Sequence, residues 1–117
     1  MWSVDEDSAE GRVTLRLSGH VTAEMMEGSV RALAAALHGR SDRWILDADL
    51  LEVTGFDARV PLVAAELFRP HVARVAHLRI RCRDRRVRVA AATAAAVIGL
   101  RFSWIEEGAD GGEASPG

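Results

Sequence analysis

The sequence lacks several residue types altogether. It contains no lysine, asparagine, glutamine or tyrosine, and all 15 basic residues are arginines. Without lysine the chain cannot build a Walker A phosphate-binding loop, form a Schiff base, or complete the lysine-containing site of a response-regulator receiver domain. These absences exclude several common kinds of phosphate and carbonyl chemistry.

Cysteine and long hydrophobic segments are also scarce. Cys82 is the single cysteine, which excludes an internal disulfide and suits a reducing cytoplasm. Residues 1–7 have neither the basic start nor the apolar run of a signal peptide. No apolar segment reaches the ~18 residues that a membrane-spanning helix needs. We therefore expect a cytoplasmic protein without membrane insertion.

Length and composition fit one globular domain. The 117 residues are 49% hydrophobic and 27% charged, and the net charge of -2 gives no overall attraction to nucleic acid or membrane surfaces. Residues 107–117 are rich in glycine, alanine and acidic residues. We expect a single domain over residues 1–106, followed by a disordered tail.

Hydrophobic periodicity predicts alternating strands and helices. Two half-buried strands form an opening hairpin, and the later strands are separated by helices, which implies parallel pairing. Thr22, Asp57 and Asp84 are predicted N-caps of the three helices. The predicted order is β-β-α-β-α-β-α-β, with elements at residues 2–6, 13–18, 22–38, 44–53, 57–70, 78–83, 84–98 and 100–106.

The strands also predict how the sheet is covered. A parallel sheet buried on both faces shows nearly continuous apolar runs, whereas Leu78, Ile80 and Cys82 alternate with arginines. We therefore predict an α/β domain whose mixed, mostly parallel sheet carries its helices mainly on one face. The other face should be open and polar, with Arg16, Arg79, Arg81 and Arg101 on it.

One segment carries a more specific signal. Residues 44–63 comprise an apolar strand, a short turn ending at Asp57, and an amphipathic helix with Pro61 in its first turn. This layout resembles the signature of STAS domains, the anti-sigma-factor-antagonist (SpoIIAA-like) family. In that family a strand leads through a "DLSGVTFIDSSGLG"-like segment into a helix. The resemblance is specific from Asp47 to Val63, and the element order fits over residues 2–106.

The resemblance implies a regulatory role, but the phosphorylatable serine that switches members of the family is replaced here. Aligned on Val53, Thr54 and Asp57, the phosphorylatable serine of the family falls at Arg59, which cannot accept a phosphoryl group. In the family this turn meets the regulatory kinase. The alternative is that Asp57 only caps the helix, with Arg59 solvated or paired with Asp57. The candidate partner-binding residues are Gly55, Phe56, Asp57, Ala58 and Arg59.

Arginines are concentrated after residue 78. They could form a basic surface for an acidic partner or for phosphates. Aromatic residues for stacking do not accompany them, and both ends of the chain are acidic, so nucleic acid is not expected. The alternative is a solvated sheet face on which arginines pair across strands with Asp47 or Asp49. The candidate basic surface comprises Arg79, Arg81, Arg83, Arg85 and Arg86.

Residues for catalysis or metal binding do not assemble in the sequence. The four histidines, His20, His38, His71 and His77, have no metal-binding spacing and are expected at the surface or its boundary. Cys82 alternates inward and should be a buried small hydrophobe. The serines lie in no nucleophile context. We expect no enzyme activity, no cofactor and no metal.

Two functions remain open. The first is a non-enzymatic STAS-like regulatory module that binds a protein partner, either a kinase or another regulatory protein, with a homodimer as a further option. The alternative is a SpoIIAA-like domain, similar to lipid-binding Sec14 folds, that holds a small apolar ligand or lipid between the helices at 26–37 and 60–68. A packed core favours the first function, and a cavity of a few hundred Å3 favours the second.

Overall fold

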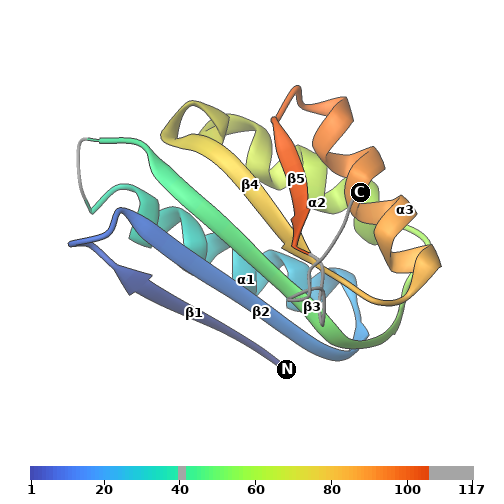
Figure 1. Cartoon of the computed structure of the whole chain (residues 1–117). Helices are drawn as coiled ribbons and strands as arrows, with labels where there is room; N and C mark the ends of the chain where they lie inside the picture. The colour runs from blue at the N-terminus through green and yellow to red at the C-terminus, as the bar shows by residue number, and fades with distance from the viewer. Residues whose placement is uncertain (40–41, 106–117) are drawn as a thin grey trace, which may run out of the picture.

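A five-stranded sheet has its helices on one face (Figure 1). The computed structural model describes residues 1–39 and 42–105, so the tail expected at 107–117 lies outside the described residues. The predicted element order is confirmed, with one added 3-10 helix. The elements are β1 (Trp2–Asp7), β2 (Arg12–Val21), α1 (Ala23–Leu37), β3 (Trp44–Phe56), α2 (Val60–Phe68), η1 (Arg69–Arg74), β4 (Val75–Arg81), α3 (Arg85–Val97) and β5 (Phe102–Ile105).

The sheet is mixed and mostly parallel, as predicted. Its strand order is β1-β2-β3-β4-β5, with β1 antiparallel to β2 and every later pair parallel. Along β2, Val13, Leu15 and Leu17 are buried toward the helices, whereas Arg16 is exposed on the opposite face. Register places Arg79 and Arg81 on that same open face, beside Asp47 and Asp49. Arg101, just before β5, is exposed.

Strand β3 is longer than the sequence predicted. Its 13 residues run to Phe56, so Gly55 and Phe56 belong to the strand, opposite His20 and Val21, and the predicted turn at 54–59 shrinks to 57–59. Pairing between β2 and β3 shifts register twice, between Arg16 and Ser18 and between Gly19 and His20. Such bulges bend a strand and re-aim its side chains near functional sites.

Two of the three predicted helix caps are present. The Thr22 hydroxyl accepts the Met25 N–H at 3.1 Å, and the Asp84 carboxylate accepts the Arg86 N–H at 2.8 Å. The prediction for Asp57 was wrong, because α2 begins at Val60 without a side-chain cap. Only the Asp57 backbone carbonyl takes part, accepting the Val60 N–H at 3.0 Å.

The core lies between the sheet and the helix layer, around the fully buried Trp44, whose indole N–H donates to the Leu37 carbonyl at 2.9 Å. Between the sheet and the helices α1, α2 and α3, the packing leaves an apolar cavity of about 160 Å3. In the described part of the chain, no helix has the length and hydrophobicity to span a membrane.

Candidate functional site

The parallel strands β2, β3 and β4 end at one edge of the sheet, where the chain enters α1, α2 and α3 (Figure 1). We call this the carboxyl edge. In open α/β sheets this is the edge at which ligands bind, because strand ends and helix N-termini converge there. The predicted partner-binding residues all belong to the β3–α2 connection at this edge or to the end of β3.

His20 and Asp57 meet at the carboxyl edge. The His20 Nε2 lies 2.7 Å from the Asp57 Oδ1, and the two side chains are 55% and 51% exposed. Asp57 therefore uses its carboxylate across the sheet instead of capping α2. The sequence had assigned His20 only to the surface, and it is the functional candidate that sequence reasoning missed.

Gly55 makes room for this contact. It pairs with His20 in the sheet, and a Cβ atom at Gly55 would lie 3.2 Å from the His20 Nδ1. That separation is tighter than most real Cβ contacts, so any larger residue would push the imidazole aside. The absence of a side chain at Gly55 therefore leaves space for the His20 imidazole.

The remaining candidates at this edge differ in accessibility. Phe56 is partly buried, packs against the core and lines the apolar cavity. Ala58 and Arg59 are exposed. Among the described residues the Arg59 guanidinium has no ion pair, because Asp57 contacts His20 instead. Of the two simple alternatives for Arg59, solvation fits the geometry and pairing with Asp57 does not.

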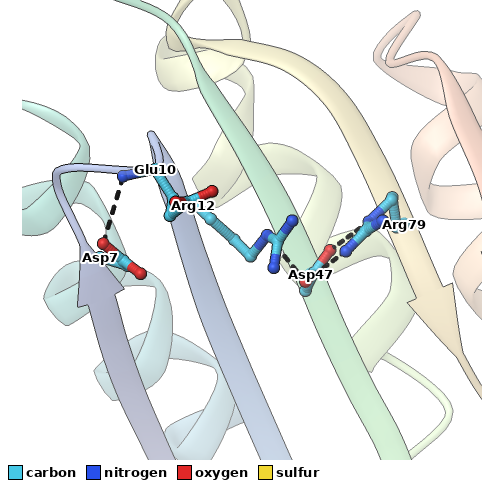
Figure 2. A network of polar contacts seen from close by, with 5 residues as sticks. All are labelled: Asp7, Glu10, Arg12, Asp47 and Arg79. Carbon is cyan, nitrogen blue, oxygen red and sulfur yellow. Dashed lines mark hydrogen bonds and ion pairs between the residues drawn. The ribbon is translucent and has the colours of Figure 1, made fainter.

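The open face of the sheet carries a network of ion pairs (Figure 2). Arg79 donates to both carboxylate oxygens of Asp47, at 2.7 and 2.9 Å, and the Arg12 Nε lies 3.7 Å from the same carboxylate. The hydrogen bond to Asp47 raises the pKa of Arg79 against the opposing effect of burial. Arg16 contacts Asp49 at 3.1 Å. This is the cross-strand pairing that the sequence left open as the alternative.

The five arginines of the candidate basic surface divide between two places. Arg79 and Arg81 lie on the open face in β4, whereas Arg83, Arg85 and Arg86 are exposed beyond its end and in the first turn of α3. The latter group lies at the carboxyl edge. Nearby, the Arg88 guanidinium stacks 4.4 Å from the centre of the Trp104 ring.

Other titratable groups sit apart from these surfaces. The His38 Nε2 is 3.4 Å from the His71 Nδ1, and burial, followed by the proximity of His38, lowers the pKa of His71. Cys82 is 8% exposed, as predicted, and burial raises the pKa of its thiol. Across residues 1–39 and 42–105, no group of three or more His, Cys, Asp or Glu side chains is placed to hold a metal ion.

Comparison with known proteins identifies the fold. No family model and no curated protein matches the sequence. The chain is similar to the crystal structure of an uncharacterized DUF3478-family protein with a SpoIIAA-like fold from Shewanella loihica PV-4, with a TM-score of 0.68, 17% identity, and coverage of 94% of this chain and 88% of that one. It is also similar to the anti-sigma factor antagonist SpoIIAA in its unphosphorylated form, with a TM-score of 0.62, 13% identity, and coverage of 92% and 91%.

These similarities extend over nearly the whole of each chain. They establish a SpoIIAA-like fold and confirm the fold expected from the resemblance found in the sequence.

Proposed function

We propose that this chain is a cytoplasmic, non-enzymatic regulatory module that binds a protein partner at the carboxyl edge. The observation that carries the proposal is the exposed Arg59, which stands next to the His20–Asp57 pair at the entrance to α2. The structurally similar SpoIIAA is named for antagonism of another protein, an anti-sigma factor. A partner that presents a carboxylate would complement Arg59, because a guanidinium can hold a carboxylate through two parallel hydrogen bonds.

The proposed module works without phosphorylation at the family position. Arg59 stands where the resembling family carries its phosphorylatable serine, and an arginine side chain has no hydroxyl. Within residues 54–59 only Thr54 has one, and it is exposed in β3. Incubation with a serine kinase followed by mass mapping tests this point. We expect no phosphate in the segment, and phosphate on Thr54 would show that the acceptor had moved.

The geometry at the carboxyl edge supports a binding role better than a catalytic one. Within the described residues, His20 hydrogen-bonds to Asp57 and to no serine, threonine or cysteine hydroxyl or thiol. A His–Asp pair activates a nucleophile only when such a group lies within hydrogen-bond reach of the imidazole. Both side chains are about half exposed, so the pair also lacks the water-excluded setting that strengthens electrostatic catalysis.

Charge reversal at Arg59 tests the binding surface. Partners are captured from native lysate with tagged protein, and the affinity of the captured protein is then measured by calorimetry for wild type, Arg59→Glu and Arg31→Glu. Arg31 is exposed on α1 and serves as the matched control. Arg59→Glu should weaken binding by about 1–3 kcal/mol, the range for a charge-assisted contact, without lowering Tm. Equal affinity of wild type and Arg59→Glu would move the interface away from this edge.

The lipid-binding alternative has less support. Pockets for drug-sized or lipid ligands usually hold about 300–1,000 Å3. The apolar cavity under α1, α2 and α3 holds about 160 Å3, below that range. The volume leaves room for a guest of about benzene size and not for a lipid, so a protein partner remains our proposal.

A further inference from the structure

We infer that the apolar cavity between the sheet and helices α1, α2 and α3 is a binding site for one small uncharged guest, either an aromatic ring of benzene size or a short alkyl chain. The cavity holds about 160 Å3 and is partly open to the surface. This inference does not rest on the proposed partner surface, which uses exposed residues of the carboxyl edge.

The sequence of α3 creates the cavity. Four alanines of the helix line the cavity, together with the larger Val87 in its first turn and Ile98 at its C-cap. Ala48 of β3 is another small residue that lines the cavity. A methyl group reaches less far than the side chains of Met26, Val30 and Leu33, with which α1 lines the same cavity, so the alanines of α3 leave space unfilled. The four alanines are Ala90, Ala91, Ala94 and Ala95.

The walls define the chemistry of the guest. Every lining residue is apolar, including Phe56, Phe68 and Leu78. A buried water needs two to four polar partners, which these walls do not offer, so water is a poor occupant. A cavity of about 150 Å3 with walls of this kind, engineered in another protein, stays dry and binds benzene or xenon. A charged or hydroxylated guest would lose its hydrogen bonds to water without replacement.

An apolar guest would also restore contacts that the empty cavity forfeits. Atoms that line a void have no packing partners on one side and lose that part of their dispersion energy. Replacing one alanine by a larger residue would remove the same void. A guest binding only the native state raises the melting temperature by mass action.

Benzene is the probe for the first experiment, with benzoate as the charged control. Amide NMR spectra of the full chain are recorded during each titration, alongside thermal unfolding. Benzene should cause saturable shifts confined to residues that line the cavity, and at ten times its Kd it should raise Tm by about 4–8 °C. Benzoate should cause neither effect. Absence of saturable shifts with benzene, or equal shifts with benzoate, would overturn the inference.

Variants of α3 test whether the guest binds in the cavity. Ala91→Leu should fill the cavity and weaken benzene binding at least about tenfold, as one leucine side chain takes up much of the space. Ala95→Val is a smaller change that serves the same purpose if the leucine does not fit. Ala96→Leu is the matched control, because Ala96 is exposed on the same helix and does not line the cavity. Unchanged affinity in the folded filled variants would place the probe elsewhere and overturn the inference.

Discussion

The Arg79 guanidinium and the Asp47 carboxylate form a two-point hydrogen-bonded pair between directly opposed positions of β4 and β3. Asp47 is only 16% exposed and Arg79 is 34% exposed, so the pair is less screened than an ordinary surface ion pair. Arg12 approaches the same carboxylate from β2. One aspartate therefore joins three neighbouring strands on the open face.

A pair of double-mutant cycles measures this relationship. For Asp47→Ala and Arg79→Ala, we expect a coupling energy of about 1 kcal/mol, at the upper end of the range for exposed pairs. For Asp49→Ala and Arg16→Ala, where contact is made through one nitrogen and the arginine is 50% exposed, we expect less than about 0.5 kcal/mol. Urea unfolding at neutral pH provides the free energies. Equal coupling in the two cycles would contradict the importance of the two-point geometry.

Gly55 should tolerate a side chain only when His20 is absent. The Gly55→Ala Cβ would press on the His20 imidazole, so this variant should lose the His20–Asp57 contact and about 0.5–1.5 kcal/mol of stability. In a His20→Ala background the same substitution should cost almost nothing. Chemical denaturation of the four proteins, with the histidine NMR signals as a local probe, decides the matter. An equal cost in both backgrounds would place the strain in the backbone.

The stability of the fold should depend on pH through His71. Its pKa is lowered in the folded protein by burial and by His38, whereas in the unfolded chain it returns to about 6.5. The unfolded state therefore binds the proton more tightly. This contribution to stability is fully present above about pH 6.5 and is lost as pH falls toward the lower folded pKa.

Melting temperatures of wild type, His71→Gln and His38→Gln between about pH 8 and pH 5 test this sign. The decline of Tm should be shallower in His71→Gln than in wild type, and His38→Gln should lie between them, because it removes only the smaller cause of the shift. A steeper decline of Tm in His71→Gln than in wild type would contradict the lowered pKa of His71 in the folded protein.

The Cys82 thiol should be inert in the native protein. It is buried, its pKa is raised by burial, and its Sγ lies 3.5 Å from the Asp84 carbonyl oxygen. Because only the thiolate reacts, modification by a disulfide reagent near pH 8 should be at least about 100-fold slower in buffer than in denaturant. Since the chain has one cysteine, the kinetics report on this site alone. Comparable rates in the two conditions would show an accessible thiol.

Most of the fold could be predicted because its signals are local. Alternation identified the strands and the open face, and Thr22 and Asp84 mark helix starts through contacts two or three residues away. The end of β3 was missed because Gly55 and Phe56 are held by pairing with β2, a distant partner. The 3-10 helix η1 was missed because the predicted helix ends at residue 70, whereas Pro70 stands in the first turn of η1, where a proline is tolerated.

The candidate site was only partly accessible to sequence reasoning. The strand–turn–helix pattern located Asp57 and Arg59 at the carboxyl edge, but the contact of Asp57 with His20 joins residues 37 positions apart. It depends on two register shifts between β2 and β3, the second of which falls at Gly19, whose positive φ of 76° favours glycine. Similarly, the arginines after residue 78 look like one cluster, yet strand alternation and the start of α3 separate them.

The five strands occupy the sheet in the order in which they occur along the chain. When each strand after β1 joins the sheet, the strand before it in the sequence already forms the edge of the sheet. No strand has to be inserted between two others. A chain emerging from the ribosome could add one strand and one helix at a time, burying each new apolar face as it appears. Synthesis and assembly can thus proceed in the same direction, from the first hairpin to β5.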